Sequence, residues 1–271
     1  MGEQPVSEKK HTVLMPDVIS DPDIEMRVFG DPVRMITPTV SRTDEVSVED
    51  WRSADAVMGW HTLRYDQTLI DQLENCKLII RVGVGFENVD LKSAGERGLA
   101  ASNVPDYGTT AVADHAIALM LSISRGIFAY SATVMDNQWT WEHISTLKRL
   151  AGSTMGVIGL GRIGTATAMR AMGLGMKVLF YDPYLKEGVD KSLGIVRCYE
   201  LPKLLGQSDV VSIHTPLTDE TKTMANEAFF KSMKPGSIFI NTARGQIVDP
   251  KALHDALKSE HLSAAGVDVW P

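Results

Sequence analysis

Short runs of apolar, β-branched residues alternate with polar or amphipathic segments along most of this chain of 271 residues. In its first part we expect strands at residues 11–15, 33–37, 55–58, 78–82 and 99–102. In its last part we expect strands at residues 154–159, 177–181, 209–214, 237–241 and 266–269. Helical patterns fall between the later strands, at residues 162–173, 199–206, 226–232 and 250–259. This alternation predicts βαβ units with parallel sheets, an α/β fold.

The middle of the chain has a different pattern. Residues 110–139 carry apolar side chains nearly all round over about four helical turns. A helix that is apolar on every side must be covered on every side, so we expect it to pack between domains or between subunits. The breaker-rich segment NVPDYG, residues 103–108, precedes it and is typical of a hinge.

Composition and charge exclude several classes of protein. A hydrophobic content of 44% and a charged content of 23% are ordinary for a globular protein. The net charge of −7 argues against binding to nucleic acid or to an anionic membrane surface. The two cysteines rule out a disulfide framework and show no metal-ligand spacing. No apolar run is long enough to span a bilayer, so we expect a soluble, cytoplasmic protein without a metal.

The most informative stretch is VIGLGRIG, in which Gly159, Gly161 and Gly164 form a G-x-G-x-x-G pattern. An apolar strand precedes it, a helix follows it, and the next strand ends on Asp182. In a dinucleotide-binding turn the first glycine permits the tight bend, the second lets the pyrophosphate approach the backbone, and the third lets the helix pack on the sheet. The N-terminus of that helix then faces the phosphates.

Asp182 decides between the two nicotinamide cofactors. Its carboxylate can accept hydrogen bonds from the adenosine ribose and would repel a 2′-phosphate, so NAD is favoured over NADP. Arg162 follows the second glycine and can reach the pyrophosphate, although it could equally be a solvated residue at the start of a helix. The pattern therefore predicts an NAD site at residues 159–164 and 182.

Beyond the glycines, several blocks resemble the D-isomer-specific 2-hydroxyacid dehydrogenase family. They are GSTMGVIGLGRIG at 152–164, the segment SDVVSIHTPL to HDALKS at 208–259, and AAGVDVWP at 264–271. Residues 81–121, from RVGVGFENVD to ALML, resemble the family's inter-domain region. GWHTL (59–63) and VLFYDPYL (178–185) are closer to the branch of the C-terminal-binding-protein corepressors, whereas DYGTTAVADH is closer to the enzymes.

The resemblance implies two doubly wound domains. The first, residues 1–103, would be a flavodoxin-like substrate domain, and the second, residues 104–271, a Rossmann NAD-binding domain. A homodimer through the helical region 110–140 is also implied. The expected reaction is NAD-dependent hydride transfer between a small D-2-hydroxy acid and its 2-keto acid, of the glycerate, glyoxylate, hydroxypyruvate or branched keto-acid kind.

The resemblance also assigns the groups that would hold the keto acid. Arg244, in NTARG, is the expected catalytic arginine, because a guanidinium matches a planar carboxylate; the alternative is a structural arginine paired with Asp249. Arg81 would contact the substrate carboxylate, or else form a buried ion pair. The remaining substrate-binding candidates are the backbone N–H groups of Val82, Gly83 and Val84 and the side chains of Trp60 and His61, where His61 could equally be a packed polar residue.

On the cofactor side the resemblance adds residues around both ends of the dinucleotide. His214, Thr215 and Pro216 would line the adenosine, and Thr242, Ala243 and Asp268 would lie near the nicotinamide. Asp114 and His115 on the long helix are expected to be structural. The other two cofactor-binding candidates are Ile163 and Val112.

The proton donor of this family is a His supported by a Glu, and by the family's spacing the Glu would fall two residues after Pro271. We therefore expect the chain to be the front of a longer protein, without the final strand of its NAD domain and without the helix that returns to the first domain. Two other functions stay open: an NAD(H)-sensing corepressor-like scaffold and a catalytically silent member of the family.

Overall fold

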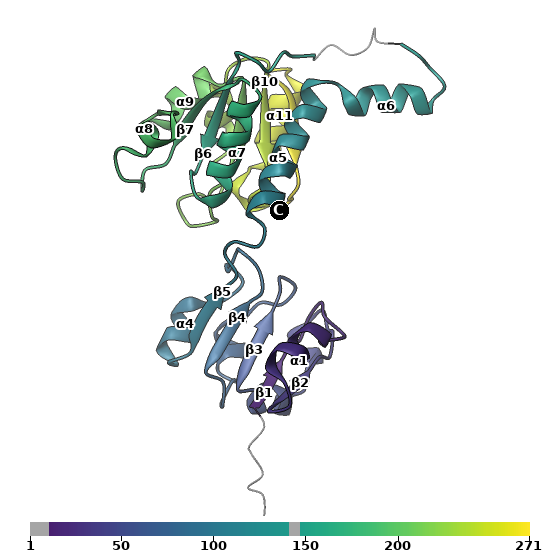
Figure 1. The fold of residues 1–271 in the computed structure, drawn as a ribbon, viewed down its shortest axis with the longest axis vertical. Helices are drawn as coiled ribbons and strands as arrows, with labels where there is room; N and C mark the ends of the chain where they lie inside the picture. Colours follow the sequence, from purple (N-terminus) through teal and green to yellow (C-terminus); the bar gives the residue numbers. More distant parts are fainter. Residues whose placement is uncertain (1–10, 141–146) are drawn as a thin grey trace, which may run out of the picture. The chain divides into compact units, whose positions relative to one another are not determined.

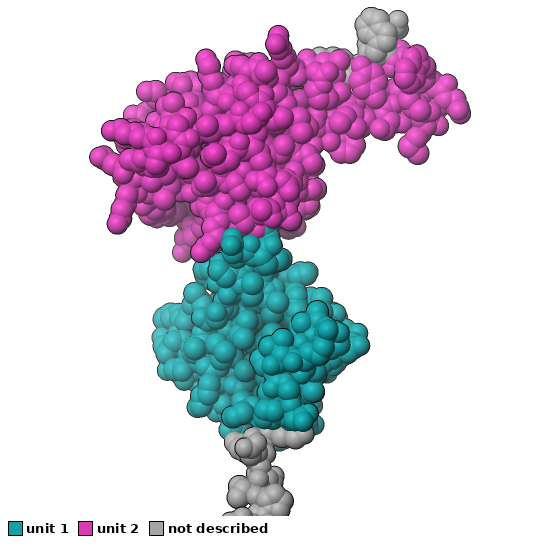
Figure 2. Space-filling view, in the orientation of Figure 1, with its two compact units in different colours: residues 1–108 teal, residues 109–271 magenta. Residues whose placement is uncertain are grey.

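The computed structural model describes residues 11–140 and 147–271. The chain divides into two compact units, Met1–Gly108 and Thr109–Pro271, here called unit 1 and unit 2 (Figure 2). The sequence prediction placed the domain boundary after residue 103. Each unit has its own sheet and its own core.

The sheet of unit 1 consists of parallel strands in the order β2-β1-β3-β4-β5. Their bounds are β1 His11–Leu14, β2 Val33–Ile36, β3 Ala56–Gly59, β4 Leu78–Arg81 and β5 Ala100–Asn103. The helical segments between them are short: α1 Asp23–Phe29, η1 Thr43–Glu45, α2 Val48–Ser53, α3 Gln67–Ile70 and α4 Leu91–Glu96. This is the flavodoxin-like strand order that the family resemblance implied.

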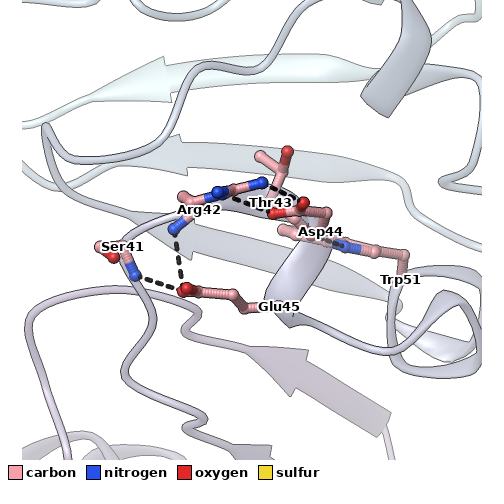
Figure 3. A network of polar contacts seen from close by, with 6 residues as sticks. All are labelled: Ser41, Arg42, Thr43, Asp44, Glu45 and Trp51. Carbon is pink, nitrogen blue, oxygen red and sulfur yellow. Dashed lines mark hydrogen bonds and ion pairs between the residues drawn. The ribbon is translucent and has the colours of Figure 1, made fainter.

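The core of unit 1 is built around Trp51 and Tyr65, whose side chains are almost fully buried. Their rings meet edge to face, with centroids 6.5 Å apart and an interplanar angle of 86°. The turn before α2 holds Trp51 in place, because its indole Nε1 donates to the Thr43 carbonyl oxygen at 3.2 Å (Figure 3). The Glu45 carboxylate closes the same turn by accepting the backbone N–H groups of residues 41 and 42, at 3.0 and 3.1 Å.

The sheet of unit 2 is also parallel, in the order β11-β10-β9-β6-β7-β8 (Figure 1). Its strands are β6 Thr154–Ile158, β7 Lys177–Tyr181, β8 Val196–Arg197, β9 Val210–Ile213, β10 Ser237–Asn241 and β11 Leu262–Val267. Counted from β6, this is the doubly wound dinucleotide-binding order, whose reversal lies between β6 and β9. Ligands of such sheets bind beyond the carboxyl ends of the strands at that point.

Helices cover both faces of this sheet. The successive residues Val157 and Ile158 of β6 belong to different core clusters, because successive side chains of a strand point to opposite faces. The clusters also include residues of the helices α5 Thr109–Ser124, α7 Arg162–Gly173, α9 Leu201–Gln207, α10 Glu227–Ser232 and α11 Pro250–Lys258. The remaining helical segments are α6 Ile127–Met135, α8 Val189–Leu193 and η2 Gly245–Ile247.

The predicted α/β fold is confirmed, and several details differ from the prediction. The apolar region 110–139 is broken into α5 and α6, which are bent by 63° at a break where Gly126 has a φ of 65°. β11 begins at Leu262 rather than 266, because pairing with β10 outweighs the weak strand propensity of its Ser and Ala residues. The elements α1, α8 and β8 were not predicted, and β8 carries Arg197.

Candidate active site

The glycine-rich turn lies directly after β6. Gly159 has a φ of 84°, and a Cβ there would lie 2.8 Å from Thr215 Cγ2 and 3.0 Å from the His214 carbonyl oxygen. A Cβ on Gly164 would overlap the Gly159 carbonyl oxygen. These two glycines are therefore required by the protein itself: the first for a left-handed backbone and the second for close packing of α7 on the turn.

Gly161 is different, since a Cβ there would meet no protein atom within 4 Å. It is the N-cap of α7 and makes no side-chain cap, and the backbone N–H groups of residues 162–164 find no acceptor among the described residues. Arg162 is exposed and Ile163 is half-buried at this end of the helix. Free N–H groups at the positive end of a helix of this length attract an anion, and the open space at Gly161 lets that anion approach the backbone.

Asp182 closes the turn from the side of β7. Its Oδ2 accepts the Leu160 N–H at 2.9 Å, and its Oδ1 accepts the Tyr184 N–H at 3.0 Å. The carboxylate is thus fixed beside the glycines, as the sequence pattern predicted. The Tyr184 hydroxyl donates to the Glu220 carboxylate, which raises the pKa of the phenol and joins the loop after β7 to the loop after β9.

The loop after β9 begins with His214, Thr215 and Pro216. Burial lowers the pKa of His214 to about 4, so the ring is neutral near pH 7, and its Nε2 shares a hydrogen bond with Ser212 Oγ at 2.8 Å. The Thr215 hydroxyl is buried and finds no partner among the described residues. An orphaned buried hydroxyl is costly, so a ligand group is its natural partner at this edge of the sheet.

The loop after β10 carries Thr242, Ala243 and Arg244. Asn241 organises it: its Oδ1 accepts the Ala243 N–H at 3.0 Å, and its Nδ2 donates to the Arg244 carbonyl oxygen at 2.9 Å. Arg244 Nη1 donates to the Ala243 carbonyl oxygen at 2.7 Å. The Thr242 hydroxyl is buried and unpartnered within the described part of the chain, as the Thr215 hydroxyl is.

Asp268, which follows β11, lies beside α5. His115 Nε2 is 3.1 Å from its Oδ1, and both side chains are about half exposed. Asp114 instead pairs with Arg170 of α7, which fits the structural role expected for it. Val112, one turn before His115, is half-buried. The structure therefore links His115, expected to be structural, to a residue expected near the nicotinamide.

In unit 1 the loop after β3 holds Trp60 and His61. The Asp17 carboxylate, which is fully buried, accepts the N–H groups of Trp60 at 2.9 Å and Thr62 at 3.1 Å. Asn88 Nδ2 donates to the carbonyl oxygens of Trp60 at 3.1 Å and Leu63 at 2.8 Å. With its backbone engaged on both sides, this loop presents side chains outward: Trp60 is half-buried and His61 is exposed.

The loop after β4 holds the other substrate-binding candidates. The Val82 N–H donates to the Gly59 carbonyl oxygen at 2.7 Å, and the Gly83 N–H donates to the Arg81 carbonyl oxygen at 2.8 Å. Of the three N–H groups expected to bind a carboxylate, only that of Val84 lacks an acceptor among the described residues. The Arg81 guanidinium lies against Gly83, where a Cβ would overlap Nη1, and its Nε is buried without a partner in the part of unit 1 that is described.

Comparison with known proteins identifies the family of this chain. Residues 117–271, more than half of the chain, match the model of the D-isomer-specific 2-hydroxyacid dehydrogenase NAD-binding domain. The chain belongs to this family. A glyoxylate reductase of Korarchaeum cryptofilum is 37% identical over 83% of this chain and 69% of its own length, and one of Thermococcus litoralis is 38% identical over 83% and 70%.

Among solved structures, a D-lactate dehydrogenase of Aquifex aeolicus, complexed with NAD and lactic acid, superimposes with a TM-score of 0.86. The two are 30% identical, and the match covers 95% of this chain and 77% of that one. These three relatives are enzymes, which favours a dehydrogenase over a corepressor-like scaffold. The predicted family and fold class are thereby confirmed.

The cofactor of this 2-hydroxyacid dehydrogenase is NAD, as the sequence predicted. The residues of unit 2 fit it on three observations that do not depend on the family. They are the open space at Gly161, the acceptor-free N–H groups at the start of α7, and the orphaned hydroxyls of Thr215 and Thr242. Among the described residues no group of His, Cys, Asp or Glu is arranged to hold a metal ion.

Four side chains of these loops escaped the sequence analysis: Asp17, Arg197, Tyr184 and Glu220. Asp17 lies two residues after the predicted strand at 11–15, which is the one local signal that could have marked it. The others act through contacts between segments that lie far apart in the sequence. Such contacts leave no periodic pattern of apolar residues in the sequence.

Proposed function

We propose that this dehydrogenase reduces glyoxylate, or a 2-keto acid of similar size, to the 2-hydroxy acid with NADH, and catalyses the reverse with NAD. Glyoxylate is the substrate named for both curated relatives. The observation that carries the proposal is Asp182, whose carboxylate is fixed at 2.9 Å from the Leu160 N–H beside an anion-binding helix start. That arrangement supports a ribose next to a pyrophosphate, and so a dinucleotide with an unphosphorylated 2′-hydroxyl.

The chain's residues hold and polarise the keto acid. NADH, when bound, supplies the hydride. We assign Arg244 to the substrate carbonyl and carboxylate: its guanidinium can hold the negative charge that develops on the carbonyl oxygen. Val84 offers an unengaged N–H to the carboxylate, and Arg81 adds a positive charge beside it. Trp60 and His61, on a braced loop, are proposed to set the size of the acid that fits.

The test pairs turnover with cofactor binding. Wild-type protein should oxidise NADH with glyoxylate faster than with pyruvate or a branched keto acid, followed by NADH absorbance. Arg244→Lys should lower kcat by about 10²–10³-fold, the typical loss when one preorganised donor is removed, while the NADH dissociation constant stays within about twofold. Unchanged turnover in Arg244→Lys would contradict its role. Failure of wild-type protein to bind NADH in calorimetry would contradict the whole proposal.

We also propose that the enzyme is a homodimer formed through residues 110–140. α6 has no buried residue, and it projects from the body of unit 2 in Figure 2. Exposed side chains on and after it include Phe128 at 63%, Met135 at 83% and Trp139 at 92%. Several large apolar side chains exposed within one short segment are typical of a protein interface. Sedimentation equilibrium should give twice the chain mass, and Phe128→Glu should shift it towards one chain.

A cytoplasmic location remains an expectation from composition. No single helix of the described residues is long and apolar enough to cross a bilayer, although the bent pair formed by α5 and α6 meets the length and composition criteria when taken together. Both cysteines, Cys76 and Cys198, are buried free thiols, and burial raises the pKa of each. Fractionation of cells that produce the full protein would test the location.

A further inference from the structure

Arg197 lies on β8, at the edge of the unit 2 sheet, where it pairs with Phe180 of β7. Its side chain is half-buried and crosses to the loop that follows β7. There Nη2 donates to the carbonyl oxygens of Asp182 and Leu185, both at 2.8 Å, and Nη1 donates to that of Lys186 at 3.2 Å. One guanidinium thus fastens three backbone positions of a single loop.

Two aromatic rings hold the guanidinium from other directions. The Arg197 Cζ lies 5.7 Å from the ring centroid of Phe180, which is fully buried, and 5.3 Å from that of Tyr199. Contacts of a cation with ring faces at this range are stabilising. Because Phe180 cannot move without disturbing the core, its contact with the guanidinium restrains the position of the Arg197 side chain.

The loop that Arg197 fastens begins with the residue proposed to bind the adenosine ribose. The Asp182 carbonyl oxygen accepts from Arg197, while its carboxylate accepts from Leu160 and Tyr184. Backbone and side chain of Asp182 are therefore both restrained. A small displacement of its backbone would move the carboxylate away from the ribose hydroxyls and would open room for a 2′-phosphate.

An arginine close to this position has an obvious alternative role, because guanidinium groups near the end of the second strand can accommodate the 2′-phosphate of NADP. The contacts of Arg197 oppose that role. Three of its five N–H donors are taken by carbonyl oxygens of the protein. Using them for a phosphate would release the loop that carries Asp182.

We propose that Arg197 is a positioning residue that sets the preference for NAD over NADP by holding the 182–186 loop, and is not a receptor for a 2′-phosphate. The proposal rests on the proposed function, since it needs Asp182 to face the ribose. It predicts that removing a cation from this region weakens binding of NADH more than binding of the more highly charged NADPH. A purely electrostatic role of Arg197 predicts the reverse.

The experiment measures the dissociation constants of NADH and NADPH by fluorescence titration, for wild type, Arg197→Met and Arg197→Lys. Arg197→Met should raise the NADH value about tenfold and the NADPH value by less, so that the preference narrows. Arg197→Lys keeps the charge but cannot donate to three carbonyl oxygens in one plane. Its ratio of NADH to NADPH dissociation constants should therefore lie between those of wild type and Arg197→Met. The matched control is Lys251→Met, which removes an exposed cation from the same unit and should leave both constants within about twofold.

A double-mutant cycle identifies the route of the effect. If Arg197 acts through Asp182, Arg197→Met should change the NADH-to-NADPH ratio by less than twofold in an Asp182→Ala background. The inference is overturned if Arg197→Met weakens NADPH at least as much as NADH, or leaves both unchanged. Should Arg197→Met fail to fold, the ratio in Arg197→Lys decides. Wild-type protein that binds neither dinucleotide would refute the proposed function, a result distinct from any of these.

Discussion

In unit 2 the loop after β7 is held by a cation, Arg197, whereas in unit 1 the loop after β3 is held by an anion, Asp17. Arg197 donates to carbonyl oxygens of its loop, whereas Asp17 accepts from N–H groups of its loop. In unit 2 the N–H groups that lack an acceptor among the described residues lie in the glycine turn at the start of α7, where they suit a phosphate. In unit 1 both kinds of backbone group of the loop 60–63 are hydrogen-bonded, because Asn88 also donates to the carbonyl oxygens of Trp60 and Leu63.

We therefore expect the two regions to recognise their proposed ligands by different means. The glycine turn of unit 2 presents backbone N–H groups, and a side chain at Gly161 would occupy the ligand's space. The braced loop of unit 1 presents side chains, and Gly83 is closed off by the Arg81 guanidinium. We expect cofactor binding to depend on the backbone and keto-acid selectivity to depend on side chains. Variants of matched residues in the two units test this division.

The largest effect should come from Gly161→Val. The new side chain meets no protein atom within 4 Å of the Cβ position, so thermal unfolding should hardly change. It would, however, fill the space through which the pyrophosphate approaches the backbone. We expect the NADH dissociation constant to rise at least ~100-fold, about 3 kcal/mol, in calorimetry.

The counterpart in unit 1 is Gly83→Ala, whose Cβ would displace the Arg81 guanidinium. It should leave the NADH dissociation constant unchanged and raise the KM for glyoxylate about tenfold, because the proposed carboxylate-binding cation is moved from its place against Gly83. If Gly83→Ala weakened NADH binding as much as Gly161→Val does, the proposed division between the two units would be wrong.

Acidification should destabilise unit 2 through His214, whose pKa burial lowers from 6.5 to about 4. Between these values the unfolded chain binds more protons than the folded one, so the free energy of unfolding falls as pH drops through that window. The loss would be on the order of 2 kcal/mol at pH 5 relative to pH 7. Urea denaturation at the two pH values measures it.

His214→Asn removes the titrating ring and should flatten this dependence on pH. Any stability that the variant loses with the Ser212 hydrogen bond is the same at both pH values, so it does not enter the difference. An unchanged difference between pH 5 and pH 7 in the variant would show that other groups cause it.

Asp17→Asn should have an effect confined to the keto acid. Two separate carboxylate oxygens accept the N–H groups of Trp60 and Thr62, whereas an amide offers one oxygen and sets an NH₂ against the other N–H. The KM for glyoxylate should rise about tenfold with the NADH dissociation constant unchanged. The control is Asp44→Asn, which changes an exposed carboxylate of the same unit, seen in Figure 3. It should leave both the KM for glyoxylate and the NADH dissociation constant unchanged. An equal change in both variants would rule out a special role for Asp17.

The same division explains what the sequence could predict. Gly159, Gly161, Gly164 and Asp182 were found because backbone recognition requires glycines at fixed spacing, and that spacing is visible in the sequence. The residues predicted to lie near them, 214–216 and 242–244, follow β9 and β10, and parallel strands bring their carboxyl ends to one edge of the sheet. The alternation of strands and helices was sufficient for the order of the main elements.

What the sequence did not reveal depends on tertiary contacts. Arg197 lies on a strand of two residues, too short for any periodic pattern, and its partners are carbonyl oxygens that every residue possesses. Asp17 contacts N–H groups more than forty residues away. The break at Gly126 is similar: an apolar sequence favours helix on both sides of it, and only the packing of α5 against the sheet shows where the buried helix ends.

The smallest predicted effect concerns His115, because its ion pair with Asp268 is about half exposed and such pairs contribute only about 0.2–1 kcal/mol. His115→Gln should raise the NADH dissociation constant about twofold to threefold, since Asp268 loses a partner that holds it near the proposed nicotinamide position. Asp114→Asn, its neighbour on α5, breaks the pair with Arg170 instead and should leave NADH binding unchanged. If both variants weakened NADH equally, the effect would come from disturbing α5 and not from Asp268. NADH binding at the nicotinamide end of unit 2 would then not depend on the Asp268 side chain. The contrast with unit 1, where side chains are expected to select the keto acid, would be sharper.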